Sequence, residues 1–507
     1  MEISWLISLI FFLSIPIFLI LKSLKPLNNK LKFPPGPPKL PIIGNIHQLA
    51  SYKTPPHHLL QDLARVHGPI MHLRLGEVST VIISSADVAK VVMRAHDANF
   101  ANRPKLIVAK DVFYDYSDIG LAPYDEYWRQ VRKLATLELL TVRRVQSFRA
   151  IREEEATMFV ESIAERAAQG CSVNLSERVF GVMFDITSRT ALNKKGKDQE
   201  AFRALITLMS KLLSGFSIAD LYPSIKLLHS IGGLKKSVKK IVDESNRILD
   251  PIIQEHKSNM IQGKVDQEDL VDVLLKFHKE DPNNNDFSLT NNNIKGIILE
   301  IFSAGTETSS TTIEWIMSEL IKNPKAMEKA QNEVREVYQG KETIDETSLD
   351  ELKFLKSVIK ETLRLHPPAP VLIPRESIEH CQICSYDIPP KTRVMVNARA
   401  IGRDPKYWQD ADTFKPERFE TSHINYKGNN FEFIPFGAGR RMCPGVTLGI
   451  ANIELPLAML LYHFDWKLPN GIKSENLDMN ELFGITVRRK NDLHVIPIPY
   501  KYSGFRQ

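Results

Sequence analysis

The sequence predicts a mainly α-helical protein with small β-sheets, an α+β fold. Residues 145–280 read as several amphipathic helices, and a longer helical pattern runs from Thr290 to about Asn323. Two short β-branched runs lie earlier in the chain, at residues 70–75 and 78–83. With 507 residues and a hydrophobic content of 43%, the chain can bury a large core.

The N-terminal stretch predicts a membrane anchor. Residues 3–21 are uncharged, strongly apolar and about as long as a helix that crosses a bilayer. Glu2 precedes this stretch and Lys22 and three further lysines follow it, which places the downstream side in the cytosol. A cleaved signal peptide is the alternative, but its apolar core is usually shorter, and no small-residue cleavage site follows here. We therefore expect a single-pass anchor.

A proline-rich segment follows the anchor. Residues 33–38 read Phe-Pro-Pro-Gly-Pro-Pro, and closely spaced prolines favour an extended, semi-rigid chain. No low-complexity linker divides the chain after residue 50. We expect three parts: an anchor at 1–22, a basic and proline-rich hinge at 23–45, and one folded domain at 46–507.

The first elements of the folded domain follow in order. Apolar spacing over residues 57–67 predicts a short helix, and Gly76-Glu77 joins the two β-branched runs into a hairpin. Ser85 is expected to cap a helix over residues 86–95. Another helix opens at residue 127. Trp128 and Arg132 share one of its faces because they are four residues apart, a spacing that alone most often means a surface cation beside a core tryptophan.

The long helix that starts after Thr290 has an unusual middle. At 1.5 Å per residue it would be roughly 50 Å long, enough to cross the molecule. Residues 304–312 read Ala-Gly-Thr-Glu-Thr-Ser-Ser-Thr-Thr, a poor helix-forming run. Thr308 can donate to the carbonyl of Ala304, open the helical ladder and admit water. The alternative is a small-residue groove for helix packing.

Charge and cysteine content exclude several classes of protein. The net charge of +6 is mild and the basic residues are dispersed, so a membrane surface or an acidic protein partner fits better than a nucleic acid. The four cysteines are Cys171, Cys381, Cys384 and Cys443. Cys381 and Cys384 lack a second ligand pair for zinc and are expected as reduced thiols in a surface loop or hairpin, consistent with the cytosol.

Residues 436–445 read Phe-Gly-Ala-Gly-Arg-Arg-Met-Cys-Pro-Gly and carry the clearest chemistry. Cys443 stands just before a predicted helix, with Pro444 suited to the first helical position. The helix dipole and free N–H groups would lower the pKa of the thiol, and the glycines would let the backbone approach a flat ligand. Such a thiolate is suited to axial ligation of a haem iron. The alternative is a buried cysteine in a glycine-rich turn.

This stretch resembles the haem-binding signature of the cytochrome P-450 family, Phe-x-x-Gly-x-Arg-x-Cys-x-Gly. Its fixed positions are met by Phe436, Gly439, Arg441, Cys443 and Gly445. The resemblance implies the P-450 fold, with haem b between the long central helix and the cysteine-loop helix, and Cys443 as the axial iron ligand. The cofactor-binding residues that it implies, including those for the haem propionates, are Trp128, Arg132, Arg375, Phe436, Arg441, Cys443 and Gly445.

Two other stretches resemble motifs of the same family. The run around residue 306 resembles its oxygen-activation motif, which implies that Thr308 hydrogen-bonds to dioxygen and that Glu307, with waters, delivers protons. Glu361 and Arg364 alone would predict an exposed ion pair. The resemblance adds Arg418 and implies a buried structural network that braces the cysteine loop.

The resemblance also implies a substrate pocket with mostly aliphatic walls. Residues 202–235 would form a mobile lid, and a turn at 482–487 would point into the pocket. Such walls predict an apolar, bulky substrate. The implied wall residues are Phe113, Ile119, Leu213, Phe216, Ile301, Ala304, Ala369, Val371, Leu372, Phe483 and Ile485.

The function implied by this resemblance is a haem-thiolate monooxygenase that hydroxylates an apolar substrate with O2. Electrons would come from NADPH through a membrane-bound P-450 reductase, with cytochrome b5 as a further partner. The motifs resemble those of plant microsomal members that oxidise specialised metabolites, so we expect an enzyme of the endoplasmic reticulum with a luminal N-terminus and a cytosolic catalytic domain. A terpenoid, either a sesquiterpene or a diterpene, is the first expected substrate and an alkaloid or phenolic the second.

Two rival functions use the same cofactor. One is a thiolate-haem isomerase or dehydratase that needs neither O2 nor a reductase, and the other is a non-catalytic haem carrier or sensor. Neither rival needs an oxygen-activation motif, so the pair Glu307 and Thr308 argues against both.

Overall fold

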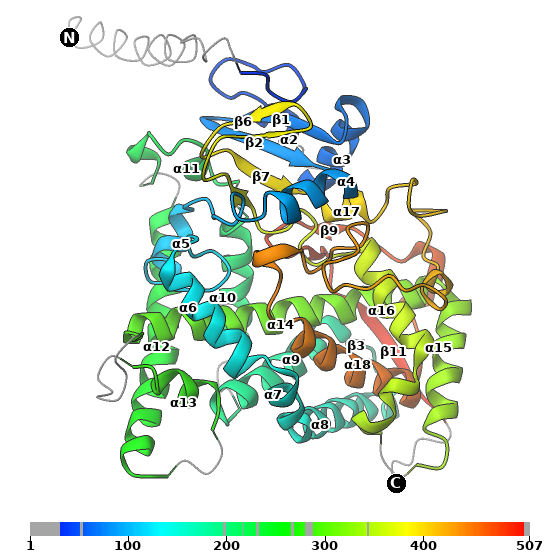
Figure 1. The fold of residues 1–507 in the computed structure, drawn as a ribbon. Coiled ribbons are helices and arrows are strands. Elements are labelled where there is room, and N and C mark those ends of the chain that lie inside the picture. The colour runs from blue at the N-terminus through cyan, green and yellow to red at the C-terminus, as the bar shows by residue number, and fades with distance from the viewer. Residues whose placement is uncertain are drawn as a thin grey trace, which may run out of the picture.

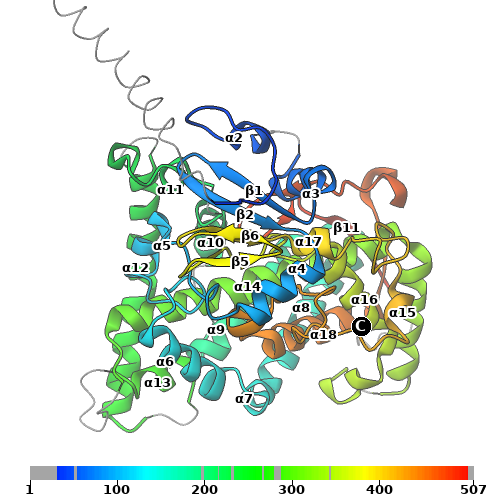
Figure 2. The same ribbon diagram turned by 45° about the horizontal axis from the view of Figure 1, so that its top comes forward.

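A long central helix organises the structure, a computed structural model that describes residues 31–50, 54–195, 199–214, 216–229, 233–264, 268–278, 287–341 and 344–500. Helix α14 (Asn291–Lys322) crosses the middle of the molecule, with most other helices around it and the largest sheet to one side (Figures 1 and 2). Thr290 caps α14 through a capping box with Asn293, so the expected start of this helix is confirmed. It remains α-helical through residues 304–312, so the expected opening of its ladder is not observed.

The helices before α14 differ widely in length. The α-helices are α2 (Ile46–Leu49), α3 (Pro56–His67), α4 (Ala86–Lys90), α5 (Ile107–Val112), α6 (Glu126–Leu134), α7 (Val142–Ser147), α8 (Arg149–Ala168), α9 (Leu175–Leu192), α10 (Gln199–Leu212), α11 (Ile218–Leu221), α12 (Leu234–Ile261) and α13 (Leu270–Leu275). Two π-helical turns, Val91–Ala95 and Ala135–Leu139, extend α4 and α6 to nearly the lengths expected from the sequence.

Among the described residues, five further α-helices follow α13. They are α14, α15 (Pro324–Val337), α16 (Lys353–Leu365), α17 (Ala398–Ile401) and α18 (Val446–His463). Short 3-10 turns occur among the described residues, at Lys226–His229, Glu346–Glu351, Pro416–Phe419, Gly439–Arg441, Pro469–Gly471 and Ser474–Asn476.

In the part of the chain that the structure describes, the strands form four small sheets. They are β1 (Ile70–Leu75), β2 (Val78–Ile83), β3 (Val173–Asn174), β4 (Arg375–Glu376), β5 (Cys381–Ile383), β6 (Tyr386–Ile388), β7 (Arg393–Val396), β8 (Phe464–Lys467), β9 (Glu481–Leu482), β10 (Arg488–Arg489) and β11 (His494–Pro499). The largest sheet has the order β1-β2-β7-β4, and only the β2–β7 pair in it is parallel. The other sheets pair β3-β11-β8, β5-β6 and β9-β10. The expected hairpin of β1 and β2 is confirmed.

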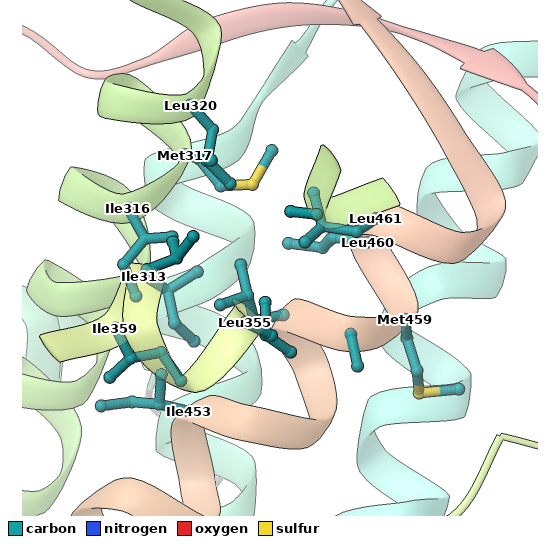
Figure 3. Packing of buried hydrophobic residues seen from close by; sticks show 14 of the residues in the cluster. Ile313, Ile316, Met317, Leu320, Leu355, Ile359, Ile453, Met459, Leu460 and Leu461 are labelled. Atoms are coloured by element: carbon teal, nitrogen blue, oxygen red, sulfur yellow. The ribbon is translucent and has the colours of Figure 1, made fainter. Parts of the chain in front are cut away.

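The main hydrophobic core joins α14, α16 and α18. Ile313 and Met317 of α14 pack against Leu355 of α16 and Leu460 of α18 (Figure 3). These side chains are all buried. Because α18 follows the cysteine loop directly, this core anchors the loop's downstream end to the central helix.

Among the described residues, α18 alone has the length and apolar composition to cross a bilayer. Its apolar side chains pack against α14, α15 and α8, which marks it as a core helix. The anchor expected at residues 3–21 lies outside the described residues. The free thiols expected at Cys381 and Cys384 are confirmed, and they stand on the β5–β6 hairpin.

Candidate active site

A large cavity opens between the middle of α14 and the loop that carries Cys443. The space free of protein atoms amounts to about 1500 Å³, including its opening to solvent. Thr308 and Ala304 of α14 line one wall, and Phe436, Cys443 and Gly445 line the other. The expected pairing of the long helix with the cysteine loop is therefore present across one continuous space.

The cysteine loop is held by buried polar contacts. The Cys443 N–H donates to the carbonyl oxygen of Phe436 at 3.0 Å, which closes the loop on itself. Gly439 adopts φ 72°, and a Cβ there would lie 2.4 Å from the carbonyl oxygen of Met93, so only glycine fits this close approach. Arg375 donates to the carbonyl oxygen of Ala438 at 2.7 Å. These contacts fix where the sulfur points before any ligand binds.

The protonation of Cys443 differs from the expectation. Helix α18 begins at Val446, so Pro444 precedes the helix instead of occupying its first position. Burial raises the pKa of the Cys443 thiol, although the N–H of Gly445 and the charge of Arg132 act in the opposite direction. The raised pKa favours the neutral thiol in the protein alone, and a bound metal ion would displace the proton.

Positive charge is concentrated around the cavity. Four arginine side chains line it: Arg103, Arg132, Arg375 and Arg441. Burial lowers the pKa of each guanidinium, and that of Arg441 falls to about 9. Asp118 and Glu300 lie nearby, but burial raises the pKa of both carboxyl groups and weakens them as counter-ions. The site thus carries excess buried positive charge, which favours an anionic ligand.

Arg103 and Glu300 were missed by the sequence reasoning. Glu300 stands inside the otherwise apolar run of residues 297–302, and a single acidic residue in such a run is unusual. Arg103 lies in a segment without clear periodicity, and it donates to the carbonyl oxygens of Ile373 and Pro374 at 2.6 and 2.8 Å. No local pattern identifies such a residue, because these two partners are about 270 positions away in the sequence.

Trp128 does not line the cavity, contrary to the expectation of a direct propionate contact. Its only donor, the indole N–H, is already bonded to the carbonyl oxygen of Ile119 at 2.9 Å. The guanidinium of Arg441 stacks over its ring at 4.0 Å. Trp128 therefore packs against Arg441 and helps to hold its guanidinium in place. Arg132 does line the cavity and donates to the carbonyl oxygen of Met442 at 2.5 Å.

Thr308 and Glu307 lie on different sides of α14. The Thr308 hydroxyl lines the cavity and donates to the carbonyl oxygen of Ala304 at 2.6 Å, as expected. Glu307 does not line this cavity but a separate polar pocket, where burial raises its pKa to about 7. Successive residues of an α-helix point about 100° apart, which accounts for the separation.

Five of the eleven expected substrate-wall residues line the cavity: Ile119, Ile301, Ala304, Ala369 and Leu372. Leu372 adopts φ 45°, which is uncommon for such a side chain and occurs here at the cavity wall. The other six do not line it: Phe113, Leu213, Phe216, Val371, Phe483 and Ile485.

Packing explains where these six side chains go. Phe113, Leu213 and Val371 are buried in neighbouring hydrophobic clusters, and Ile485 is partly buried against one of them. Phe216 and Phe483 contact each other edge to face at 5.6 Å, and His57 stacks on Phe483 at 5.8 Å. These aromatic contacts hold the start of the β9–β10 turn against α3, and the N–H of Ile485 at its tip donates to the carbonyl oxygen of Ser210 in α10 at 2.9 Å.

The structure contains the buried network of Glu361, Arg364 and Arg418. Arg364 contacts both carboxylate oxygens of Glu361, at 2.7 and 2.8 Å, and Arg418 contacts one of them at 3.0 Å. Glu361 and Arg364 are almost fully buried. Arg364 also donates to the carbonyl oxygens of Gly402 and Ala411, each at 2.6 Å. The network thereby ties α16 to the chain that leads into the cysteine loop.

Comparison with known proteins decides the family. Residues 34–495 match the family model for cytochrome P-450. The chain belongs to the cytochrome P-450 family. It is 53% identical to desmethyl-deoxy-podophyllotoxin synthase of Sinopodophyllum hexandrum over 93% of this chain and 92% of that protein. It is 48% identical to premnaspirodiene oxygenase of Hyoscyamus muticus over 99% of this chain and 100% of that protein.

The fold agrees with that family. A solved zebra fish cytochrome P-450 with abiraterone superposes with a TM-score of 0.74 at 25% identity, covering 88% of this chain and all of the other. The P-450 fold, mostly helical with small sheets, is thus confirmed. The protein is a P-450 monooxygenase, an oxidoreductase that uses haem b, O2 and electrons from NADPH supplied through a reductase.

The cavity fits haem b by its chemistry. Cys443 offers the sulfur ligand, and the excess of buried arginines offers partners for two propionates. Arg132, Arg375 and Arg441 line the cavity and would hold those carboxylates, and Phe436 and Leu372 would offer apolar contact. When bound, haem b supplies oxygen activation and insertion into a C–H bond. The chain's own residues position the substrate and provide the hydroxyl of Thr308 on the opposite wall.

Proposed function

We propose that this monooxygenase hydroxylates an apolar specialised metabolite of plants, with a terpenoid (a sesquiterpene or diterpene) as the first candidate. The observation that carries this proposal is the substrate end of the cavity, where Ile301, Ala304 and Ala369 present aliphatic surface near Thr308. Few polar anchors stand there, which suits a hydrocarbon better than a charged or sugar-bearing substrate. The relative named for premnaspirodiene, an unsaturated hydrocarbon by its name, supports this choice.

An alkaloid or phenolic substrate is the second candidate. The relative named for a podophyllotoxin precursor is more similar in sequence than the one named for a hydrocarbon. Overall identity therefore does not decide the substrate. A few wall residues such as Leu372 and Ala369 would decide it, because one methylene in an apolar pocket changes the discrimination between two substrates by about 1–3 kcal/mol.

The experiment is expression in yeast microsomes with a plant P-450 reductase. Sesquiterpene and diterpene hydrocarbons, indole alkaloids and simple phenolics are supplied in turn with NADPH and isotopically labelled O2. We expect a terpene product that gains one labelled oxygen atom, detected by mass spectrometry. Conversion of only the alkaloids or phenolics would overturn the terpenoid assignment, and rearranged products without labelled oxygen would favour an isomerase.

We further propose that residues 1–22 anchor the enzyme in the endoplasmic reticulum membrane with a luminal N-terminus, and that residues 23–45 form the hinge to a cytosolic catalytic domain. Lys22, Lys25, Lys30 and Lys32 on the downstream side support this topology. Removal of residues 1–22 should shift the protein from the carbonate-resistant membrane pellet to the supernatant. P-450 reductase and cytochrome b5 are the proposed partners on the cytosolic side.

Thr308 provides a test of oxygen chemistry. In Thr308→Ala we expect product formed per NADPH to fall by roughly 10- to 100-fold, because a positioned hydroxyl that guides proton transfer is lost. NADPH consumption should continue, with its electrons recovered as hydrogen peroxide. Parallel assays of product, NADPH and peroxide measure this change.

The matched control for this variant is Thr157→Ala. Thr157 also donates to the carbonyl oxygen four residues earlier, at 2.8 Å, but on the surface of α8. It should couple NADPH to product as the unaltered enzyme does. If Thr308→Ala still coupled NADPH consumption fully to product, the proposed role of this hydroxyl would be excluded and an isomerase function would be favoured.

A further inference from the structure

A second, polar space lies on the other side of α14 from the Cys443 cavity. Glu307, Ser310 and Glu314 line it, while Thr308 and Thr312 line the Cys443 cavity. Residues three and seven positions apart share one face of an α-helix. Helix α14 therefore separates the two spaces, and Glu307 and Thr308 are neighbours in the chain that face one space each.

The polar pocket has the size and walls of a water site. It encloses about 370 Å³ including its open mouth. Its walls also include Ser176 and Phe180 of α9, Arg203, Ile206 and Thr207 of α10, Thr311 of α14 and Arg488 of β10. Hydroxyl, guanidinium and carboxyl groups surround this space, which suits ordered water with several polar partners.

Glu314 is buried at the end of this pocket farther along α14. Ser176 is its hydrogen-bond partner. Since the N–H of Leu493 donates to the Ser176 oxygen at 2.7 Å, the hydroxyl proton of Ser176 is directed to Glu314. Burial raises the pKa of Glu314 to about 7, with Ser176 acting in the opposite direction. The charged groups that face it are Arg488, Arg489 and Asp492.

Glu307 closes the other end of the pocket. Ser210 and Thr486 hydrogen-bond to its carboxyl group, and burial raises its pKa to about 7. Seven residues of α-helix separate Glu307 from Glu314, which is about 10 Å along the axis. The two side chains with water between them can span that distance. A proton-transfer group works best when its pKa lies near the working pH, and both carboxyl groups meet that condition.

A partly exposed ion pair stands at the edge of this pocket. Arg203 lines the pocket and pairs with Asp492 at 3.2 Å, and both side chains are partly exposed. Asn174 also contacts Asp492, at 2.9 Å. The Arg203–Asp492 pair thus offers solvent an entry to a pocket that both Glu314 and Glu307 line.

We propose that Glu314 passes protons from solvent through water in this pocket to Glu307, and that the Glu307 side chain then turns around α14 to deliver them on the Thr308 side. This inference rests on the proposed monooxygenase turnover, in which substrate, O2, NADPH and one proton yield hydroxylated product, water and NADP+. Two protons and two electrons are consumed at the oxygen for each product molecule. Each proton that Glu307 gives up is replaced from Glu314, which recovers one from solvent, so neither carboxyl group changes over a cycle.

Infrared spectroscopy of the resting ferric protein tests the relay without turnover. The carbonyl stretch of a protonated carboxylic acid should titrate near pH 7, and Glu314→Gln should remove one such component. Ser176→Ala keeps the carboxyl group but removes a hydrogen bond that lowers its pKa, so the titration should move to higher pH. A band unchanged in both variants would show that Glu314 is not a titrating acid and would overturn the relay.

Turnover provides the second test. With a substrate identified in the microsomal assay, Glu314→Gln should lower kcat by roughly 10-fold or more, with little change in KM and a larger solvent deuterium isotope effect. Glu314→Asp should restore part of the rate, because it keeps an exchangeable proton. Glu319→Gln is the matched control: Glu319 is a buried carboxylate on α14 that contacts His366 at 2.7 Å, outside the pocket.

The two proposals fail in different ways. If no apolar compound is hydroxylated by the unaltered enzyme, the proposed substrate class fails and the infrared test still stands. If hydroxylation proceeds and Glu314→Gln behaves like Glu319→Gln in kcat and isotope effect, protons enter by another route and the relay is wrong.

Discussion

Replacing Cys443 with serine is expected to abolish hydroxylation completely. Cys443 is the only cysteine among the described residues that lines the cavity, and as a thiolate ligand it would donate electrons to the haem iron and favour O–O cleavage. A serine oxygen cannot replace that donation. The reduced carbon monoxide complex should lose the long-wavelength absorption band typical of thiolate-ligated haem, and no hydroxylated product should form in the microsomal assay.

Cys384→Ser is the matched control. Cys384 is a free, exposed cysteine on the β5–β6 hairpin and does not line the cavity. This variant should keep both the absorption band and the turnover. Normal turnover by Cys443→Ser would contradict the assignment of the iron ligand, whatever the haem content of the preparation.

Replacing Glu361 with glutamine is expected to have the largest effect on stability. The change leaves Arg364 and Arg418 buried or half-buried without a full counter-charge, and breaking a buried ion pair in this way costs about 3–5 kcal/mol. That cost is a large part of the roughly 5–15 kcal/mol by which a folded domain is stable. Because Arg364 also holds the carbonyl groups of Gly402 and Ala411, we expect low recovery of haem-loaded protein and a lower midpoint of unfolding.

Asp62→Asn is the control for the loss of an ion pair. Asp62 pairs with Arg65 at 3.0 Å on the surface of α3, where both side chains are more than half exposed. Exposed pairs contribute roughly 0–1 kcal/mol, so this variant should unfold close to the unaltered protein. Equal stability of Glu361→Gln and Asp62→Asn in denaturant titrations would show that the buried network does not stabilise the fold.

The sequence predicted much of the local structure because its signals are local. Thr290 and Ser85 cap helices that follow them directly, and Gly76 turns a hairpin between adjacent strands. The cysteine loop was identifiable for the same reason, since its chemistry is carried by ten consecutive residues. Short-range hydrogen bonds and turn geometry determine such features, and both can be read from spacing.

The surroundings of the site depended on tertiary packing. Phe216 and Phe483 are far apart in the sequence and meet each other instead of the cavity, and Trp128 gives its single N–H to Ile119. The pKa of Cys443 also follows from burial, which outweighs the local N–H group that the sequence suggested. An apolar side chain can line the cavity wall or pack in the hydrophobic core equally well. Its residue type therefore does not show which of the two it joins.

The sequence by itself determined the long central helix and the ten-residue cysteine loop, and its resemblance to the P-450 family predicted the buried Glu–Arg network. Only the tertiary structure decided which face of α14 meets the Cys443 cavity and which meets the polar pocket with Glu307 and Glu314. The physical reason is that a helix displays side chains on every side. The neighbours that make one face a substrate wall and another a water site come from distant parts of the chain.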